Sequence, residues 1–294
     1  MAENSTPSGL RIAYRQHRRD WADFRYCYPV VSRRSGGLSI GINLNPDKAC
    51  NFDCIYCQVD RSTPPVIRQV DLDIVQTELE RLCDQSADGT LFTAPPFDRI
   101  PAEKRVVRDI AFSGDGEPTT YPRFEDAVRM AAAVKTSRRL EAAKMVLITD
   151  ACYLAKPNVR RALEILDRHQ GEIWAKLDAG TQAYYELVNR PNYPLTHVMA
   201  NIIDAAKVRP IVIQSLWMRV HGDGPDPGEI TAYVGRLREI IDAGGRLKLI
   251  QTYTIARETT ESYATPLTDE KLDAIARRIR AAVDCPVECF GAAG

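Results

Sequence analysis

The sequence predicts an α/β protein built on a parallel sheet with helices on its outside. Short apolar runs alternate with amphipathic helical patterns along most of the 294 residues, and this strand-then-helix unit occurs six times. Parallel neighbours in a sheet need a crossover connection, which a helix supplies. Right-handed crossovers either close such a sheet into a barrel or leave it open and doubly wound, and composition does not choose between them.

Each predicted strand is a short apolar run bounded by turn residues. The runs span residues 38–44, 109–114, 144–150, 172–179, 210–220 and 246–256, with a further short run at 286–290. The helix-like segments cover residues 70–86, 124–139, 158–169, 181–189 with 195–207, 227–243 and 268–283. Asp226-Pro227 is a helix start signal, Gly244-Gly245 is a stop signal, and Thr268 followed by Glu270 opens the last helix.

The charge distribution suggests a basic N-terminal extension, residues 1–37, ahead of one catalytic domain, residues 38–294. Lys plus Arg and Asp plus Glu number 39 each, so the net charge gives no support to a nucleic-acid-binding protein. The extension has three acids and seven arginines. The arginines are Arg11, Arg15, Arg18, Arg19, Arg25, Arg33 and Arg34. These arginines form either a patch for an anionic partner or an ordinary solvated face.

Nothing in the sequence indicates a membrane or an exported protein. No apolar run approaches the length of about 20 residues that a bilayer span needs. The N-terminus MAENSTPSGL is polar and lacks the apolar region of a signal peptide. We therefore expect a cytoplasmic protein, in which eight cysteines indicate metal or redox chemistry rather than a disulfide framework.

Three of these cysteines, Cys50, Cys54 and Cys57, lie within the eight residues CNFDCIYC. Thiolates are soft ligands that suit zinc, Cu(I) and iron–sulfur clusters. A structural zinc site has four ligands, often in two pairs, and no partner pair lies near this triplet. Three protein ligands leave one coordination position open, where a substrate or cofactor can bind.

The triplet resembles the signature of the radical S-adenosylmethionine (SAM) superfamily, Cys-x3-Cys-x2-Cys after the first barrel strand, with an aromatic residue, here Tyr56, before the last cysteine. The resemblance implies a partial (β/α)6 barrel and a [4Fe–4S] cluster held by the three cysteines. It also implies that SAM chelates the fourth iron and is cleaved to a 5′-deoxyadenosyl radical, with a flavodoxin- or ferredoxin-type electron donor.

A second motif, SGDGEPTTYP, follows the second predicted strand. In the family, a Gly-Gly-Glu motif here contacts the amino group of SAM, and this chain has Asp115 where many members have glycine. Glycines allow close approach of the backbone, and Glu117 can balance an ammonium. The residues that match the motif are Gly114, Asp115, Gly116, Glu117 and Pro118.

Further candidates lie at the ends of later strands. Lys176 and Asp178 share one face of their strand, where they form either a structural ion pair or contacts with the SAM carboxylate or a substrate. Thr149, Asp150 and Gln251 occupy positions where the family contacts SAM.

Two other groups have both a functional and a bland interpretation. His221, in the loop HGDGPDPG, either touches substrate and moves protons or belongs to an ordinary strand-to-helix loop. Four separate cysteines either hold an auxiliary cluster or are small buried hydrophobic residues. They are Cys27, Cys152, Cys285 and Cys289.

Over roughly residues 28–290 the chain resembles the wyosine-related branch of the superfamily, through the cysteine loop, SGDGEPT, KLDAG, NRP and QTYTIAR. It departs from the transfer-RNA enzymes of that branch, because only Cys27 precedes the triplet and no flavodoxin-like domain is present. We therefore favour a small-molecule or peptide substrate. Two alternatives remain. One is an RNA-modifying enzyme that binds phosphates through Arg15, Arg18 and Arg19, and the other is a non-enzymatic metal-binding module.

Overall fold

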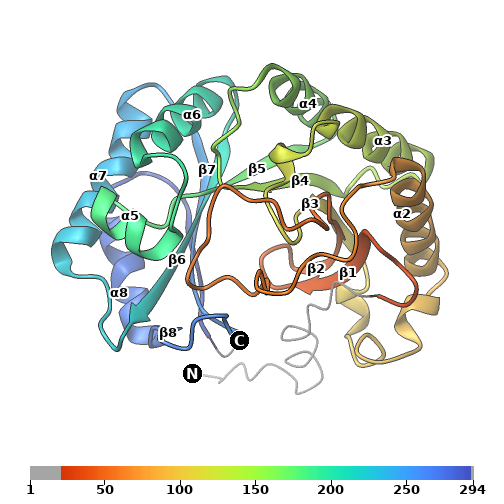
Figure 1. Cartoon of the computed structure of the whole chain (residues 1–294), viewed down its shortest axis with the longest axis horizontal. Helices are drawn as coiled ribbons and strands as arrows, with labels where there is room; N and C mark the ends of the chain where they lie inside the picture. The colour runs from red at the N-terminus through yellow and green to blue at the C-terminus, as the bar shows by residue number, and fades with distance from the viewer. Residues whose placement is uncertain (1–20, 293–294) are drawn as a thin grey trace.

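The computed structural model describes residues 21–292, which form a curled half-barrel with helices around it (Figure 1). The main sheet has the order β1-β2-β3-β4-β5-β6-β7-β9, with β8 paired to β6. Strands β2 to β7 are parallel and follow chain order, as predicted. The strands are β1 Cys27–Ser32, β2 Gly37–Ile42, β3 Val107–Phe112, β4 Lys144–Thr149, β5 Gly171–Lys176, β6 Ile211–Val220, β7 Leu247–Thr254, β8 Ala264–Pro266 and β9 Val287–Phe290.

The helices lie on the outer side of the curved sheet, in the order in which they follow the strands (Figure 1). The α-helices are α2 Leu72–Ala87, α3 Phe124–Ser137, α4 Pro157–Arg168, α5 Gln182–Asn189, α6 Leu195–Val208, α7 Pro227–Asp242 and α8 Asp269–Arg280. Three short 3₁₀ helices complete the described part: η1 Thr90–Phe92, η2 Ala102–Lys104 and η3 Pro118–Thr120. The partial barrel with outer helices is therefore confirmed.

Two strands were not predicted. β1 contains Pro29, which cannot donate to a ladder and is tolerated because β1 is an edge strand, antiparallel to β2. β8 has three residues, too few for a periodic pattern. Since β1 falls in the expected N-terminal extension and residues 1–20 lie outside the described part, the boundary after residue 37 stays a prediction.

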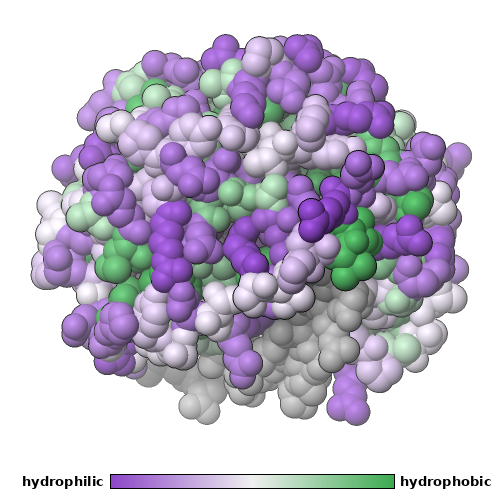
Figure 2. Space-filling model, in the orientation of Figure 1, coloured by the Kyte–Doolittle hydropathy of each residue, from purple (hydrophilic) through white to green (hydrophobic). Residues whose placement is uncertain are grey.

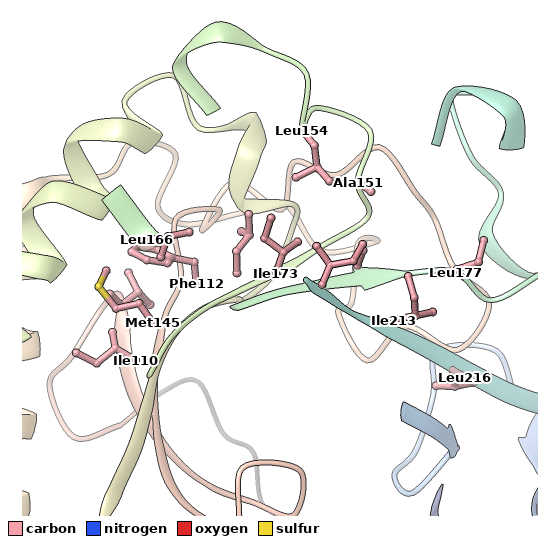
Figure 3. Packing of buried hydrophobic residues seen from close by; sticks show 14 of the residues in the cluster. Ile110, Phe112, Met145, Ala151, Leu154, Leu166, Ile173, Leu177, Ile213 and Leu216 are labelled. Atoms are coloured by element: carbon pink, nitrogen blue, oxygen red, sulfur yellow. The ribbon is translucent and has the colours of Figure 1, made fainter. Parts of the chain in front are cut away.

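The sheet is packed on both of its faces. Ile110 and Phe112 of β3 point outward with Met145 of β4 toward Leu166 of α4 (Figure 3). The residue between the first two, Ala111, points inward to a separate cluster, in keeping with the alternation of side chains along a strand. Inside the half-barrel that cluster consists of Ala111, Val146, Trp174 and Val212.

Within residues 21–292 no helix combines the length and apolar character needed to cross a bilayer. Figure 2 shows one face, which is mostly hydrophilic with small, separated apolar groups.

Candidate active site

The cysteine loop follows β2 and is anchored by its own apolar residues. Phe52 and Ile55 are buried in the core, 4% and 1% exposed. Ile55 N donates to Val188 O at 3.1 Å, and Asp53 N donates to Asn189 O at 3.0 Å, so the loop runs along the end of α5. The non-cysteine residues of CNFDCIYC therefore hold the loop in place.

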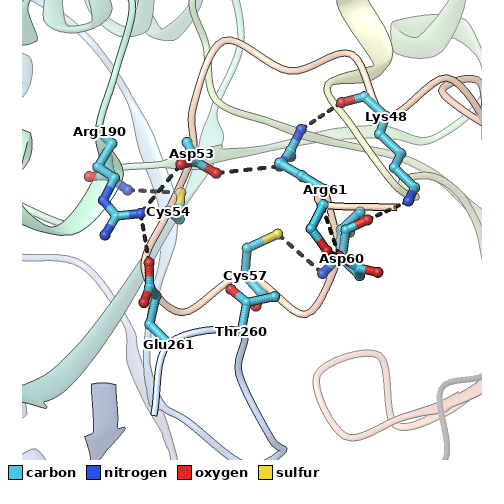
Figure 4. A network of polar contacts seen from close by, with 12 residues as sticks. Lys48, Asp53, Cys54, Cys57, Asp60, Arg61, Arg190, Thr260 and Glu261 are labelled. Carbon is cyan, nitrogen blue, oxygen red and sulfur yellow. Dashed lines mark hydrogen bonds and ion pairs between the residues drawn. The ribbon is translucent and has the colours of Figure 1, made fainter. Parts of the chain in front are cut away.

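Charged and polar contacts fasten the outer side of this loop (Figure 4). Arg190 contacts Asp53 at 3.4 Å and Glu261 at 2.8 Å, which joins the loop to the segment after β7. Thr260 N donates to Cys57 O at 3.0 Å from that same segment. The triplet is thus held from both the α5 side and the β7 side of the barrel.

All three cysteines line one cavity of about 250 Å³ at the carboxyl ends of the parallel strands. The same cavity is lined by the predicted residues Tyr56, Gly114, Asp115, Gly116, Glu117, Thr149, Asp150 and Lys176. Pro118 begins η3 and is buried rather than lining the cavity. Among residues 21–292, no group of three His, Cys, Asp or Glu side chains converges as a ligand set for a single metal ion. The three ligands of a cluster bind different irons, so they need not converge on one point.

The GDGEP loop lies directly against the cysteine loop. Glu117 N donates to Ala49 O at 2.9 Å, immediately before Cys50. A Cβ at Gly116 would lie 2.0 Å from the same carbonyl oxygen, and one at Gly114 would lie 2.3 Å from Asn43 Oδ1. Only glycine fits at either position, because both Cβ atoms would overlap fixed neighbouring atoms.

Asp115, which replaces a glycine of the family motif, forms hydrogen bonds with Asn43. Asn43 Nδ2 donates to Asp115 Oδ2 at 2.6 Å, and Asp115 N donates to Asn43 Oδ1 at 3.1 Å. The aspartate thus joins the GDGEP loop to the end of β2.

Glu117 is buried and already heavily engaged. Its Oε1 accepts from Thr119 N at 3.1 Å, from the Thr119 hydroxyl at 2.5 Å and from the Thr149 hydroxyl at 2.7 Å. Its Oε2 accepts from Asp150 N at 2.7 Å. Burial, followed by the charge of Asp150, raises the pKa of Glu117. This carboxylate fixes the carboxyl end of β4 to the GDGEP loop.

Asp150 has one carboxylate oxygen that accepts no hydrogen bond from residues 21–292. Its Oδ1 accepts from Cys152 N at 2.9 Å and from Asn51 Nδ2 at 3.3 Å. Its Oδ2 is buried and has no hydrogen-bond partner among residues 21–292, in a side chain that lines the cavity. Burial raises the pKa of Asp150. An unpaired buried carboxylate oxygen is unfavourable unless a donor arrives, so this cavity is suited to a positively charged or N–H group.

A polar network surrounds the middle cysteine. Asn189 Nδ2 donates to Cys54 Sγ at 3.4 Å and to Asp178 Oδ2 at 2.9 Å. Lys176 Nζ lies 3.6 Å from Cys54 Sγ and 3.9 Å from Asp178 Oδ2, and the Tyr56 hydroxyl donates to the same carboxylate. Lys176 and Asp178 are therefore brought together, both as a loose ion pair and as neighbours of a predicted metal ligand.

A second cavity of about 260 Å³ adjoins the first. The two share six lining residues, Arg34, Tyr56, Cys57, Ile148, Lys176 and Arg257. The second cavity extends toward the ends of β6 and β7, where Gln214, Leu216 and Tyr253 line it.

Two predicted site residues are not brought to these cavities. His221 is exposed and stacks on Tyr263 with 4.3 Å between ring centroids, and it lines neither cavity. Gln251 is buried and lines a different cavity, of about 550 Å³, together with Arg34. Gln214 Nε2 donates to its Oε1 at 2.8 Å, and it is Gln214 that lines the second cavity. His221 directly follows the last residue of β6, and its backbone N donates to Tyr263 O at 3.1 Å, so it is held against the segment before β8.

The site residues that sequence reasoning missed include Arg34, Asn189 and Gln214. Asn189 belongs to the NRP motif quoted above, which was a usable signal. Arg34 was counted with the basic extension, whereas the structure places it at both cavities. Arg11, Arg15, Arg18 and Arg19 lie outside the described residues.

The four remaining cysteine candidates lie in separate places. Cys27 is in β1, Cys152 follows β4, Cys289 is in β9 and Cys285 precedes that strand. Within the described part they do not form a ligand group with each other.

Comparison with known proteins settles the class of the site. A family model described as Radical SAM superfamily matches residues 44–225, more than half of the chain. The chain belongs to the radical SAM superfamily. Members of this superfamily use a [4Fe–4S] cluster and SAM, so membership implies SAM cleavage chemistry at such a cluster.

The curated relatives of this radical SAM chain share only part of their length with it. A protein named GTPase Obg from Brachyspira hyodysenteriae is 25% identical over 88% of this chain and 34% of its own. A UPF0026 protein from Helicobacter pylori is 25% identical over 76% of this chain and 60% of its own. The chain thus spans less than two thirds of either relative.

Two solved radical SAM structures share the fold. Streptococcus suis SuiB bound to S-adenosylmethionine has a TM-score of 0.57 and 13% identity, covering 88% of this chain and 52% of SuiB. TYW1 with a lysine-pyruvate adduct bound, an enzyme of wyosine synthesis, has a TM-score of 0.52 and 13% identity, covering 84% of this chain and 74% of its own. At these identities the likeness is one of fold.

The residues at the first cavity fit both cofactors. Burial, followed by the charges of Asp150 and Glu117, raises the pKa of Cys50 to about 12, so this thiol stays protonated until a metal displaces the proton. The three thiols supply the soft ligands, and Asp150 Oδ2 supplies an acceptor for a cationic group.

Proposed function

We propose that this radical SAM enzyme holds its cluster through Cys50, Cys54 and Cys57 and abstracts a hydrogen atom from a small molecule or peptide. One observation carries the proposal: the three thiols and the GDGEP loop border one cavity, and that cavity adjoins a second. When bound, the cluster and SAM supply a one-electron cleavage that yields the 5′-deoxyadenosyl radical. The protein positions the cofactors and the substrate.

Asn189 and Lys176 stabilise Cys54 as a thiolate. Both lie within hydrogen-bond reach of its sulfur, and donors to a ligand atom favour its deprotonated form. Asp178 orients Asn189 through a 2.9 Å hydrogen bond and is itself held by Leu216 N at 2.8 Å. Lys176 and Asp178 are, in this proposal, positioning residues for the metal ligand.

Asp150 is the acid that receives the ammonium of SAM. Its Oδ2 has no hydrogen-bond partner among residues 21–292, whereas both oxygens of Glu117 already accept protein hydrogen bonds. In this proposal Glu117 does not contact SAM but positions Asp150, because its carboxylate accepts a hydrogen bond from Asp150 N and joins it to the GDGEP loop. The electron donor is proposed to be a flavodoxin- or ferredoxin-type protein.

The first experiment is anaerobic reconstitution with iron and sulfide, followed by dithionite and SAM. We expect about four irons per chain, a cluster absorption band and formation of 5′-deoxyadenosine. Alanine in place of Cys50, Cys54 or Cys57 should abolish all three signals while leaving the far-UV circular dichroism unchanged.

Cys285→Ala is the matched control, because Cys285 is partly buried like Cys50 and Cys57 but lies outside the cavity. It should keep the cluster. Persistence of the cluster in Cys54→Ala, or loss of the cluster in Cys285→Ala alone, would contradict the ligand assignment. For the RNA alternative, salt-dependent RNA binding that is lost in an Arg15, Arg18 and Arg19 variant is the deciding observation.

A further inference from the structure

Among residues 21–292, cationic side chains predominate in the lining of the second cavity. Four of them line it, and no aspartate or glutamate of this part of the chain does. The cations are Arg33, Arg34, Lys176 and Arg257. Clefts lined by one sign of charge concentrate ions of the opposite sign. The first cavity differs, since its lining includes Asp115, Glu117 and Asp150.

One of these four cations, Arg34, lies against two aromatic rings. It lines both cavities, and its guanidinium carbon is 5.3 Å from the ring centroid of Trp174 and 5.3 Å from that of Tyr253. Within residues 21–292 no carboxylate lies within ion-pair distance of Arg34. Two aromatic rings hold the cation electrostatically, while its five N–H donors can bind the oxygens of an oxyanion.

Burial raises the pKa of Asp109, and the charge of Arg34 partly offsets this, but the two groups do not form an ion pair and Asp109 accepts from the Ser39 hydroxyl instead. A half-buried guanidinium that no carboxylate pairs with directly is an unfavourable arrangement for stability alone. The two aromatic contacts fix its position, which reduces the entropy lost when it binds a ligand. A guanidinium presents paired donors that match carboxylate and phosphate oxygens. The arrangement therefore resembles a binding group prepared for an anion more than a structural ion pair.

The neighbouring groups and the space limit the size of that anion. Gln214 is buried and lines the same cavity, with its amide nitrogen donating to Gln251 Oε1, and Leu216 supplies an apolar surface. The cavity volume of about 260 Å³ lies near the lower end of the range of small-molecule pockets, roughly 300–1,000 Å³. This room suits a small metabolite.

We propose that the substrate carries a carboxylate or phosphate group that Arg34 binds in the second cavity, assisted by the positive charge of Arg33 and Arg257. This inference rests on the proposed function, because it assigns the second cavity to the substrate and the first to the cofactors. It restricts an unidentified substrate to small oxyanions.

The test measures anion binding to the reconstituted enzyme with SAM present, by isothermal titration calorimetry. Two matched probe pairs separate the chemistries: glutarate with glutaramide, and glycerol 3-phosphate with glycerol. We expect one or both acids to bind, and each neutral analogue to bind about ten- to a hundredfold more weakly. A preference for glutarate identifies a carboxylate substrate, and a preference for glycerol 3-phosphate identifies a phosphate.

Arg34→Gln should weaken acid binding by about ten- to a hundredfold, with Arg34→Lys intermediate because it keeps the charge but loses the planar fork. Arg129→Gln, an exposed residue of α3 in an ion pair with Glu125, is the matched control and should change nothing. Equal binding of acids and neutral analogues, or unchanged acid binding in Arg34→Gln, would overturn the inference. An equal loss of SAM affinity in Arg34→Gln overturns it too, because Arg34 would then serve SAM.

The same preparations separate this inference from the proposed function. Cluster content and substrate-free formation of 5′-deoxyadenosine are measured on each sample. If both are normal and no acid is preferred, the inference fails alone. If cluster or cleavage is absent while acids still bind through Arg34, the proposed function fails and the anion site stands.

Discussion

At Gly116 the backbone of the GDGEP loop passes so close to the cysteine loop that a methyl group has no room. The Cβ of alanine would lie 2.0 Å from Ala49 O and 2.7 Å from Asn45 Cβ. Ala49 O is also the acceptor for Glu117 N, so it cannot shift without breaking that hydrogen bond. One residue therefore sets the spacing between the proposed SAM contacts and the cluster ligands.

We expect Gly116→Ala to push the two loops apart. SAM affinity should fall roughly ten- to a hundredfold, and the free energy of unfolding should fall by about 1–3 kcal/mol. Equilibrium dialysis with SAM and urea denaturation measure the two effects.

Gly235→Ala is the control, because Gly235 is exposed in α7 and its Cβ would meet nothing within 4 Å. It should leave SAM binding unchanged and stabilise the protein by about 0.5–1 kcal/mol. Equal SAM affinities in the two variants would show that the close approach at Gly116 does not govern the site.

Among the helices, α7 and α5 form a support that reaches the middle cysteine. Glu229, in the first turn of α7, accepts from Thr181 N at 3.2 Å and from its hydroxyl at 2.6 Å. Thr181 caps α5 by accepting from Tyr184 N. The other end of α5 presents Asn189, whose amide contacts Cys54. The position of Cys54, a proposed cluster ligand, thus depends on a helix pair outside the cavity.

Glu229→Ala should leave the backbone donors of Gly180 and Thr181 buried without their acceptor. We expect the free energy of unfolding to fall by about 1–3 kcal/mol for each donor left unpaired. Glu239→Ala, which removes an exposed ion pair with Arg236 on the same helix, should change it by about 0–1 kcal/mol. Urea unfolding measures both changes. Similar losses of unfolding free energy in the two variants would argue against a supporting role for Glu229.

Across the whole molecule, one acid links three strands at the amino ends of the barrel. Glu172 of β5 is buried and contacts Lys144 of β4 and Lys248 of β7, each at 2.7 Å, and Trp174 Nε1 at 2.9 Å. Burial alone would raise the pKa of Glu172, but these three hydrogen bonds outweigh burial and lower it. The folded state therefore prefers the ionised carboxylate.

A lowered folded pKa means that the stabilisation is complete above the unfolded value of about 4.3 and is lost as pH falls through the folded value. At pH 7 we expect the free energy of unfolding of the wild-type protein to be about 1–3 kcal/mol higher than that of the Glu172→Gln variant. The difference should shrink as pH falls below about 4. Urea unfolding between pH 7 and 3 tests this, and a pH-independent difference would refute it.

The sequence was sufficient wherever the informative residues are neighbours in the chain. The six parallel strands and the helices between them follow from local periodicity, and the three cysteines lie within eight residues. Asn189 was missed because it lies 135 positions from Cys54, and only the docking of α5 brings them together. Arg34 was missed because an arginine after an unpredicted edge strand gives no sign that it turns into the barrel.

The fastening of the cysteine loop bears on the order in which the chain is synthesised. The Thr260 hydroxyl donates to Cys57 O across 203 positions, and Glu261 contacts Arg190. A ribosome makes the chain from its N-terminus, so Cys57 emerges long before Thr260 does. Until residues 260 and 261 have been made, the β7 side of the loop has nothing to bind. The thiols are therefore made 203 positions before the residue that fastens Cys57 from the β7 side, and they stay without that contact while the intervening chain is synthesised.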